Sequence, residues 1–116
     1  MWYSSYTMLR TERQEKIICK ECPLAKVAHI FGDTCTLLII RDLQHSPKRF
    51  KDLETSLAGI SSRTIALKLK FLESNKIIVR KIFKEKPPKV EYSLTLKGKA
   101  LCKITDEMRS YGKKYL

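Results

Sequence analysis

Residues 60–96 read Ile-Ser-Ser-Arg-Thr-Ile-Ala-Leu-Lys-Leu-Lys-Phe-Leu-Glu-Ser-Asn-Lys-Ile-Ile-Val-Arg-Lys-Ile-Phe-Lys-Glu-Lys-Pro-Pro-Lys-Val-Glu-Tyr-Ser-Leu-Thr-Leu. The first part of this stretch has the pattern of an amphipathic helix. Ser61 is suited to cap its start, and Asn75 is typical of its end. Its apolar residues repeat at i, i+4 and i+7 and form one stripe, namely Ile65, Leu69 and Leu72. The sequence therefore predicts a helix over residues 61–75.

A β-hairpin pattern follows this helix directly. Residues 77–84 and 89–95 are two β-rich runs, and Glu85-Lys86-Pro87-Pro88 between them is typical of a hairpin tip. In the second run Val90, Tyr92 and Leu94 alternate with polar residues, so we expect one face of that strand to be core. A serine-capped helix followed by a lysine-rich hairpin over 77–95 is half of what a DNA-binding winged helix requires.

Helical patterns lie on both sides of this segment. They cover roughly residues 4–20, 23–32, 33–43, 50–57 and 97–114. Pro23 suits a first helical turn, Asp33 or Thr34 can cap the next helix, and Gly98 is expected to delay the last one. Helix 33–43 is expected to bury Leu37, Leu38, Ile40 and Leu43. Residues 48–50 are expected to pair as a short edge strand.

This order of elements predicts an α+β, mostly α fold. A helix, a short turn, a helix and a hairpin make a winged helix-turn-helix, here in a single domain over residues 1–116. The helices over 4–20 and 97–114 lie outside that minimal module, and each is amphipathic. We expect a second subunit to bury their apolar faces, which carry Tyr6, Leu9, Ile17, Ile104, Met108 and Tyr111.

Positive charge is concentrated on the helix and hairpin. The formal net charge at pH 7 is +12 over 116 residues, and residues 60–89 supply nine basic and two acidic side chains. Such a patch attracts polyanions, because each Lys or Arg that meets a phosphate releases condensed counterions. Double-stranded DNA is therefore the expected partner. A solvated face kept for solubility and a membrane surface are the alternatives.

Helix 61–75 carries the candidate recognition surface opposite its apolar stripe. Arg63 near the helix start can contact guanine O6 and N7, and Leu67 can touch a thymine methyl. The expected contacts from this helix are Ser61, Ser62, Arg63, Thr64, Ala66, Leu67 and Lys70. The expected contacts from the hairpin and the DNA backbone side are Lys48, Arg49, Lys84, Lys86 and Lys89. A surface helix with one stray leucine, and lysines that only protect a sheet edge, are the alternatives.

Several function classes are not supported by the sequence. No apolar run approaches the roughly 18–20 residues of a membrane span, and no signal-peptide pattern is present, so we expect a cytoplasmic, nucleoid-associated protein with reduced cysteines. No phosphate-binding loop or nucleophile elbow occurs, so no enzyme and no cofactor are expected. Cys19 and Cys22 form a C-x2-C pair, but a second ligand pair for zinc is missing, so no metal site is expected.

The ordered motifs resemble those of HxlR-type winged-helix regulators over about residues 22–112. They are Cys22-Pro23-Leu24, the run from Gly32 to Leu43, Arg49 to Leu53, Gly59-Ile60-Ser61, Leu69 to Glu73, the run from Pro87 to Thr95, and Lys97-Gly98. The resemblance implies a homodimeric transcription regulator whose terminal helices form the dimer and whose helix 61–75 enters the major groove. The family usually has Lys-Trp where this chain has Thr34-Cys35, so local packing there must differ.

In some members of that family the cysteine that matches Cys22 senses electrophiles, quinones or oxidants. Cys22 precedes a predicted helix start, where the helix dipole and free N–H groups stabilise a thiolate. Cys22 is therefore the main candidate sensor, with Cys19 and Cys35 beside it; an inert Cys22 is the alternative. The expected function is a sequence-specific DNA-binding regulator that represses by occluding a promoter. The rivals are a DNA-binding or architectural protein with no sensor, and a zinc-stabilised interaction domain.

Overall fold

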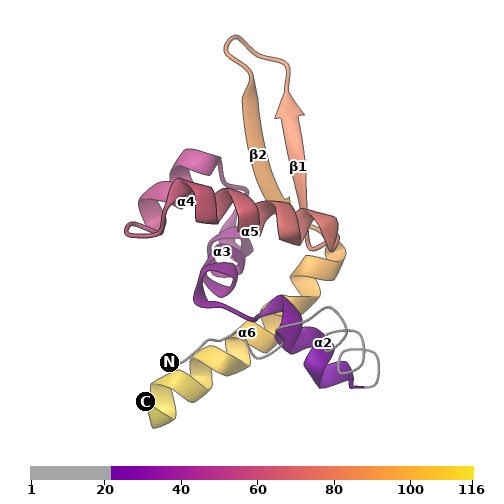
Figure 1. Ribbon diagram of the computed structural model, residues 1–116, viewed down its shortest axis with the longest axis vertical. Coiled ribbons are helices and arrows are strands. Elements are labelled where there is room, and N and C mark those ends of the chain that lie inside the picture. Colours follow the sequence, from indigo (N-terminus) through magenta and orange to yellow (C-terminus); the bar gives the residue numbers. More distant parts are fainter. Residues whose placement is uncertain (1–21) are drawn as a thin grey trace.

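The computed structural model describes residues 22–116, and Figure 1 shows how their elements are arranged. In chain order they are α2 (Pro23–Ile30), α3 (Thr34–His45), α4 (Phe50–Ser56), α5 (Ser62–Ser74), β1 (Ile78–Phe83), β2 (Lys89–Leu94) and α6 (Leu96–Tyr115). The predicted helix 4–20, with Tyr6, Leu9, Ile17 and Cys19, lies outside the described residues. The assignment of residues 1–116 to a single domain stays a prediction.

Helix α3 is the central element and packs against α4, α5, α6 and β2. Asp33 caps it by accepting a hydrogen bond from the Thr36 N–H at 2.8 Å. Lys68 of α5 lies 2.6 Å from the same carboxylate and so ties α5 to the start of α3. Burial acts to raise the pKa of Asp33, but the bonds from Lys68 and Thr36 outweigh it and hold that pKa below its ordinary value.

The core side of α3 differs in part from the prediction. Ile40 and Leu43 are buried as expected, but Leu37 and Leu38 are only half-buried. The remaining buried positions of α3 are Cys35, Thr36 and Ile39. The prediction was wrong about Leu37 because a four-residue aliphatic block offers no polar position to fix the phase of the helix.

The segment from Lys48 to Ser61 joins α3 to α5. Lys48 makes an isolated antiparallel bridge with Tyr92, with backbone N–O distances of 2.9 and 2.8 Å. The predicted edge strand at 48–50 is therefore one bridge long, and α4 begins at Phe50. Gly59 has φ +98°, a conformation that side chains rarely adopt, and it lets the chain turn from α4 into α5.

Helix α5 begins and ends as the sequence predicts. Ser61 is its N-cap and accepts a hydrogen bond from the Thr64 N–H at 3.1 Å. Its apolar stripe is buried, and Asn75 is its C-cap. Lys76 then adopts φ 62°, and the Ile77 N–H donates to the Leu72 carbonyl at 3.0 Å. This pair of features is a Schellman motif with lysine where glycine is usual.

Strands β1 and β2 form a two-stranded antiparallel hairpin that projects from the helices (Figure 1). Ile78 pairs with Leu94 at the base, and Phe83 pairs with Lys89 near the tip. Only the base enters the core, where Ile78 and Leu94 are buried. Val90 and Tyr92 are half-buried, so the predicted core face of this strand extends for less of its length than its alternation suggests.

Helix α6 begins at Leu96, directly after the hairpin. Thr95 caps it by accepting a hydrogen bond from the Gly98 N–H at 3.1 Å, and its hydroxyl also donates to the Lys76 carbonyl at 2.6 Å. The prediction that Gly98 delays this helix was wrong. Gly98 lies in the first turn, where a Cβ would come within 2.1 Å of the Ile77 carbonyl oxygen. Glycine is needed there for close backbone approach, not for a stop.

Among the described residues, no single helix has the length and apolar character needed to cross a membrane. Helices α2 and α3 pass that test only when joined, and they are bent by 82° relative to each other.

We predict that Gly98→Ala destabilises the protein by about 1–3 kcal/mol, because the added methyl group meets a backbone oxygen that cannot move without shifting β1 or α6. Gly32→Ala is the matched control, since its Cβ would meet only carbonyl oxygens at 3.5 and 3.6 Å, which is ordinary contact. Urea unfolding measures both variants. Equal stability of the two variants would contradict the assigned role of Gly98.

Candidate nucleic-acid interface

One face of α5 is open to solvent and opposes the face that packs in the core. Its exposed residues are Ser62, Arg63, Ala66, Leu67 and Lys70, which are five of the seven contacts expected from this helix; Ser61 is exposed at the N-cap and Thr64 is half-buried. Leu67 is 56% exposed, which is a large apolar exposure for a helix centre. The small side chains and the exposed Leu67 allow a ligand surface to approach this helix closely.

The polar side chains at the N-terminal turn of α5 have different hydrogen-bond partners. The Ser61 hydroxyl donates to the Thr64 hydroxyl at 2.9 Å, so both belong to the cap. The Ser62 hydroxyl donates to the Glu54 carboxylate of α4. Within residues 22–116, Arg63 has no carboxylate partner, so its guanidinium is available to a ligand. Sequence reasoning missed the Ser62–Glu54 contact, because nothing local in the sequence links those two positions.

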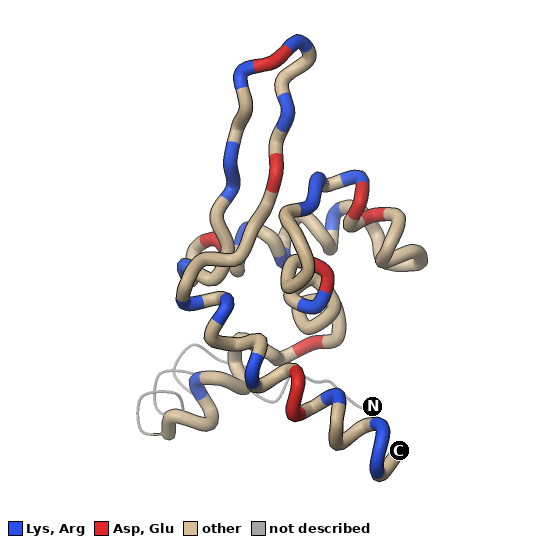
Figure 2. Tube along the Cα trace, turned by 180° about the vertical axis from the view of Figure 1, so that it is seen from behind, with Lys and Arg blue, Asp and Glu red and all other residues tan. Residues whose placement is uncertain are grey.

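Lysines and an arginine line both arms and the tip of the hairpin, as Figure 2 shows from behind. Lys84 and Lys86 at the tip are exposed. Lys89 pairs with Glu91 at 3.1 Å and also lies 5.4 Å from the centre of the Phe83 ring. Lys81 lies 5.6 Å from the same ring on one side of the hairpin. The ring therefore holds two ammonium groups near the tip.

Lys48 and Arg49 lie at the start of α4, next to the hairpin base. The backbone bridge from Lys48 to Tyr92 fixes this position, and the Arg49 N–H donates to the Asp52 carboxylate at 2.9 Å. The Arg49 side chain is exposed and the Lys48 side chain is half-buried. The structure thus connects the start of α4, the exposed face of α5 and the hairpin through short backbone links.

The cysteines differ in environment. Cys22 is exposed at the N-cap of α2, as its position before Pro23 predicts. Cys35 is 7% exposed, and burial, with a smaller contribution from Asp33, raises the pKa of its thiol. Burial likewise raises the pKa of Cys102 in α6. Cys35 of α3 therefore fills core space. The described residues contain no group of three or more side chains suited to hold a metal.

The last half of α6 exposes an apolar row. Its members are Ile104, Met108, Tyr111, Tyr115 and Leu116, and they line an open groove of about 730 Å³. The sequence predicts the first three of these residues on one face. The Tyr111 and Tyr115 rings lie 4.9 Å apart. The row has no partner within the described part of the chain.

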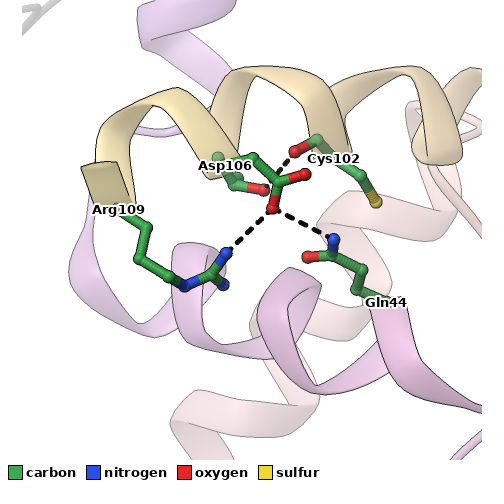
Figure 3. A network of polar contacts seen from close by, with 5 residues as sticks. Gln44, Cys102, Asp106 and Arg109 are labelled. Atoms are coloured by element: carbon green, nitrogen blue, oxygen red, sulfur yellow. Dashed lines mark hydrogen bonds and ion pairs between the residues drawn. The ribbon is translucent and has the colours of Figure 1, made fainter. Parts of the chain in front are cut away.

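A polar network that the sequence did not indicate fixes α6 against α3 (Figure 3). Asp106 accepts hydrogen bonds from Gln44 of α3 at 3.2 Å and from Arg109 at 2.8 Å. These two donors, Gln44 first, hold the pKa of Asp106 below its ordinary value. The Gln44–Asp106 bond adds to the packing of α6 against α3.

A model of the HxlR-like helix-turn-helix family matches residues 30–116, from the end of α2 to the end of α6. The chain belongs to this family. Its fold is accordingly a winged helix-turn-helix, as predicted, and its function is that of a DNA-binding transcriptional regulator and not of an enzyme.

Curated relatives agree with the HxlR-like assignment. The HTH-type transcriptional regulator YodB of Bacillus subtilis is 38% identical over 95 residues, which cover 81% of this chain and 85% of YodB. The crystal structure of a protein from Porphyromonas gingivalis W83, assigned to the MarR family of transcriptional regulators, is 38% identical, covers 84% of this chain and 95% of that one, and has a TM-score of 0.78.

A third similar protein is described as a redox regulator. HypR in its reduced form is 29% identical, with a TM-score of 0.76, and the match covers 79% of this chain and 91% of HypR. YodB has itself been solved in reduced, diamide-treated and quinone-bound forms. Proteins similar to this chain are therefore described by their redox state or by a bound quinone.

Proposed function

We propose that this HxlR-like protein is a sequence-specific DNA-binding repressor that acts as a homodimer. The observation that carries the proposal is the solvent-exposed face of α5 beside a basic hairpin. Among the described residues, Lys84 and Lys86 at the hairpin tip form no ion pair. Helix α5 enters the major groove of each half-site, and the two half-sites lie about one helical turn apart or a multiple of it. A dimer bound across a promoter excludes polymerase, and so represses transcription in the nucleoid.

Arg63 provides the base contact with the most directional chemistry. Its guanidinium has no carboxylate partner among the described residues, and it is positioned by the first turn of α5. A bidentate contact with guanine O6 and N7 suits that geometry. Leu67, one turn further along the same face, contacts a thymine methyl. Ala66 and Lys70 complete the face, while Ser61, Ser62 and Thr64 place the helix start near a phosphate.

Contacts with the DNA backbone come from two connected places. Lys48 and Arg49 lie at the start of α4, and Lys84, Lys86 and Lys89 lie on the hairpin. The hairpin lies beside the groove that α5 enters, so its tip reaches the adjacent minor groove or its phosphates. These ammonium groups supply affinity that depends on salt, and α5 supplies the sequence preference.

Dimerisation buries the apolar row of α6. Met108 is 45% exposed and Tyr111 is 60% exposed, which is costly for large apolar side chains without a partner. A second subunit offers the same surface, and symmetric dimers are the commonest assembly of soluble proteins. The predicted helix 4–20 contributes Tyr6, Leu9 and Ile17 to the same interface.

Thiol modification at Cys22 switches this regulator. Its exposure makes the thiol accessible to small reagents, and the redox descriptions of HypR and YodB support the same idea. A small electrophile or oxidant is the inducer. The alternative is a regulator of the same fold with an inert Cys22.

We predict that Arg63→Ala weakens binding to a selected cognate duplex by about 1–3 kcal/mol and relaxes its sequence preference, because a base contact is lost. Lys86→Ala should weaken all duplexes alike and reduce the salt slope by about one, because only a phosphate contact is lost. Lys103→Ala, an exposed lysine of α6, removes the same charge far from α5 and is the control. Gel-shift titrations at several salt concentrations measure all three variants.

Sedimentation of the wild-type complex should give two chains per duplex. The proposal fails if Arg63→Ala behaves like Lys103→Ala on the cognate duplex, or if one chain binds per site.

We also predict that diamide or a quinone changes the DNA affinity of the wild-type protein and leaves Cys22→Ser unaffected. Cys102→Ser is the matched control, since burial raises the pKa of that thiol and it should not respond. Anaerobic gel shifts before and after treatment measure the effect. A wild-type protein that binds DNA equally with and without the reagent supports the alternative without a sensor.

A further inference from the structure

A pocket of about 430 Å³ lies between α2, the end of α5 and the start of α6. We propose that this pocket binds a small organic anion, namely an apolar ring system that carries one carboxylate. This site is separate from the Cys22 thiol, and the binding it provides is reversible and non-covalent.

The inner wall of the pocket is apolar. Val27 and Ile30 come from α2, Leu101 comes from α6, and Ile77 lies between α5 and β1. Ile77 is 2% exposed and belongs to the main core. The volume is within the range of small-molecule sites, and these branched side chains suit a flat hydrocarbon ring.

Two ammonium groups face the same pocket and define the charge of its ligand. Lys26 of α2 and Lys97 of α6 both line it, and no carboxylate side chain among the described residues does. The Lys97 ammonium donates to the Asn75 carbonyl at 2.8 Å, which leaves donors of that group for a ligand. Within residues 22–116, Lys26 forms no ion pair. Two cations beside an apolar wall favour a carboxylate attached to an apolar body.

The pocket also touches the end of the helix that we assign to DNA. Asn75 lines it, caps α5 and donates from its amide to the Phe71 carbonyl at 2.9 Å. His29 of α2 lines it too and packs edge-on against the Phe71 ring, with ring centres 5.7 Å apart. A carboxylate that shares the Lys97 ammonium with the Asn75 carbonyl therefore changes how the end of α5 is held.

This arrangement makes the pocket an effector site for DNA binding. By linkage, an anion that alters DNA affinity through α5 must have its own affinity altered by DNA to the same extent. This regulatory step rests on the proposed function, whereas the binding of the anion does not.

The experiment titrates the full-length protein with 2-naphthoate and, as a neutral match, 2-naphthamide. Carbon-labelled methyl groups of Ile, Leu and Val report the position of the ligand by NMR. The methyl signals of Val27, Ile30, Ile77 and Leu101 should shift with 2-naphthoate, and 2-naphthamide should bind about tenfold more weakly, because it carries no negative charge to pair with the two ammonium groups.

Lys97→Met and Lys26→Met should each lower the affinity for 2-naphthoate several-fold, and Lys103→Met, outside the pocket, should not. Equal affinity for the acid and the amide overturns the proposal, as do shifts confined to Ile104 and Leu116 at the far end of α6. No DNA is present in these titrations, so a failure here is distinct from a failure of DNA binding. A gel shift with and without 2-naphthoate then tests the regulatory step, which is overturned if DNA affinity does not change.

Discussion

The rest of the structure depends on one close backbone contact, that of Gly98 in the first turn of α6 with the Ile77 carbonyl. A Cβ at Gly98 would lie 2.1 Å from that oxygen, so no other residue fits without a shift of the chain. Thr95 reinforces the contact, since its N–H donates to the Ile77 carbonyl at 3.0 Å and its hydroxyl to the Lys76 carbonyl. One small region therefore joins the end of α5, the start of β1, the end of β2 and the start of α6.

This junction fixes the geometry on which the proposed function relies. The face of α5 that carries Arg63 and the hairpin that carries Lys86 leave it in fixed directions, and the proposed function requires both to meet the same stretch of DNA. Helix α6 leaves it in another direction, held against α3 by the Gln44–Asp106 bond, and carries the apolar row that we assign to the dimer (Figures 1 and 3). In the proposed dimer, the same contact sets the spacing of the two α5 helices. The proposed anion pocket shares Ile77 with this contact, and its Lys97 directly precedes Gly98.

Local sequence was sufficient where a feature depends on neighbours along the chain. The Ser61 cap, the apolar stripe of α5 and the hairpin tip follow from short-range patterns, and the structure has each of them. It was insufficient where the deciding partner is remote in sequence. The role of Gly98 depends on an oxygen of Ile77, and the bond between Ser62 and Glu54 depends on how α4 meets α5. Burial of Cys35 likewise depends on how α3 packs against the rest of the core. Its position two residues after the Asp33 cap does not indicate that burial.

The central claim is that α5 and the hairpin together form the DNA-binding surface. Amide NMR of the full-length protein, titrated with a duplex selected from a random pool, tests it most directly. The account predicts that the largest shifts fall on residues 61–70 and 84–89, with smaller ones at Lys48 and Arg49. Shifts confined to α2 and the last turns of α6, with the amides of α5 unchanged, would contradict it.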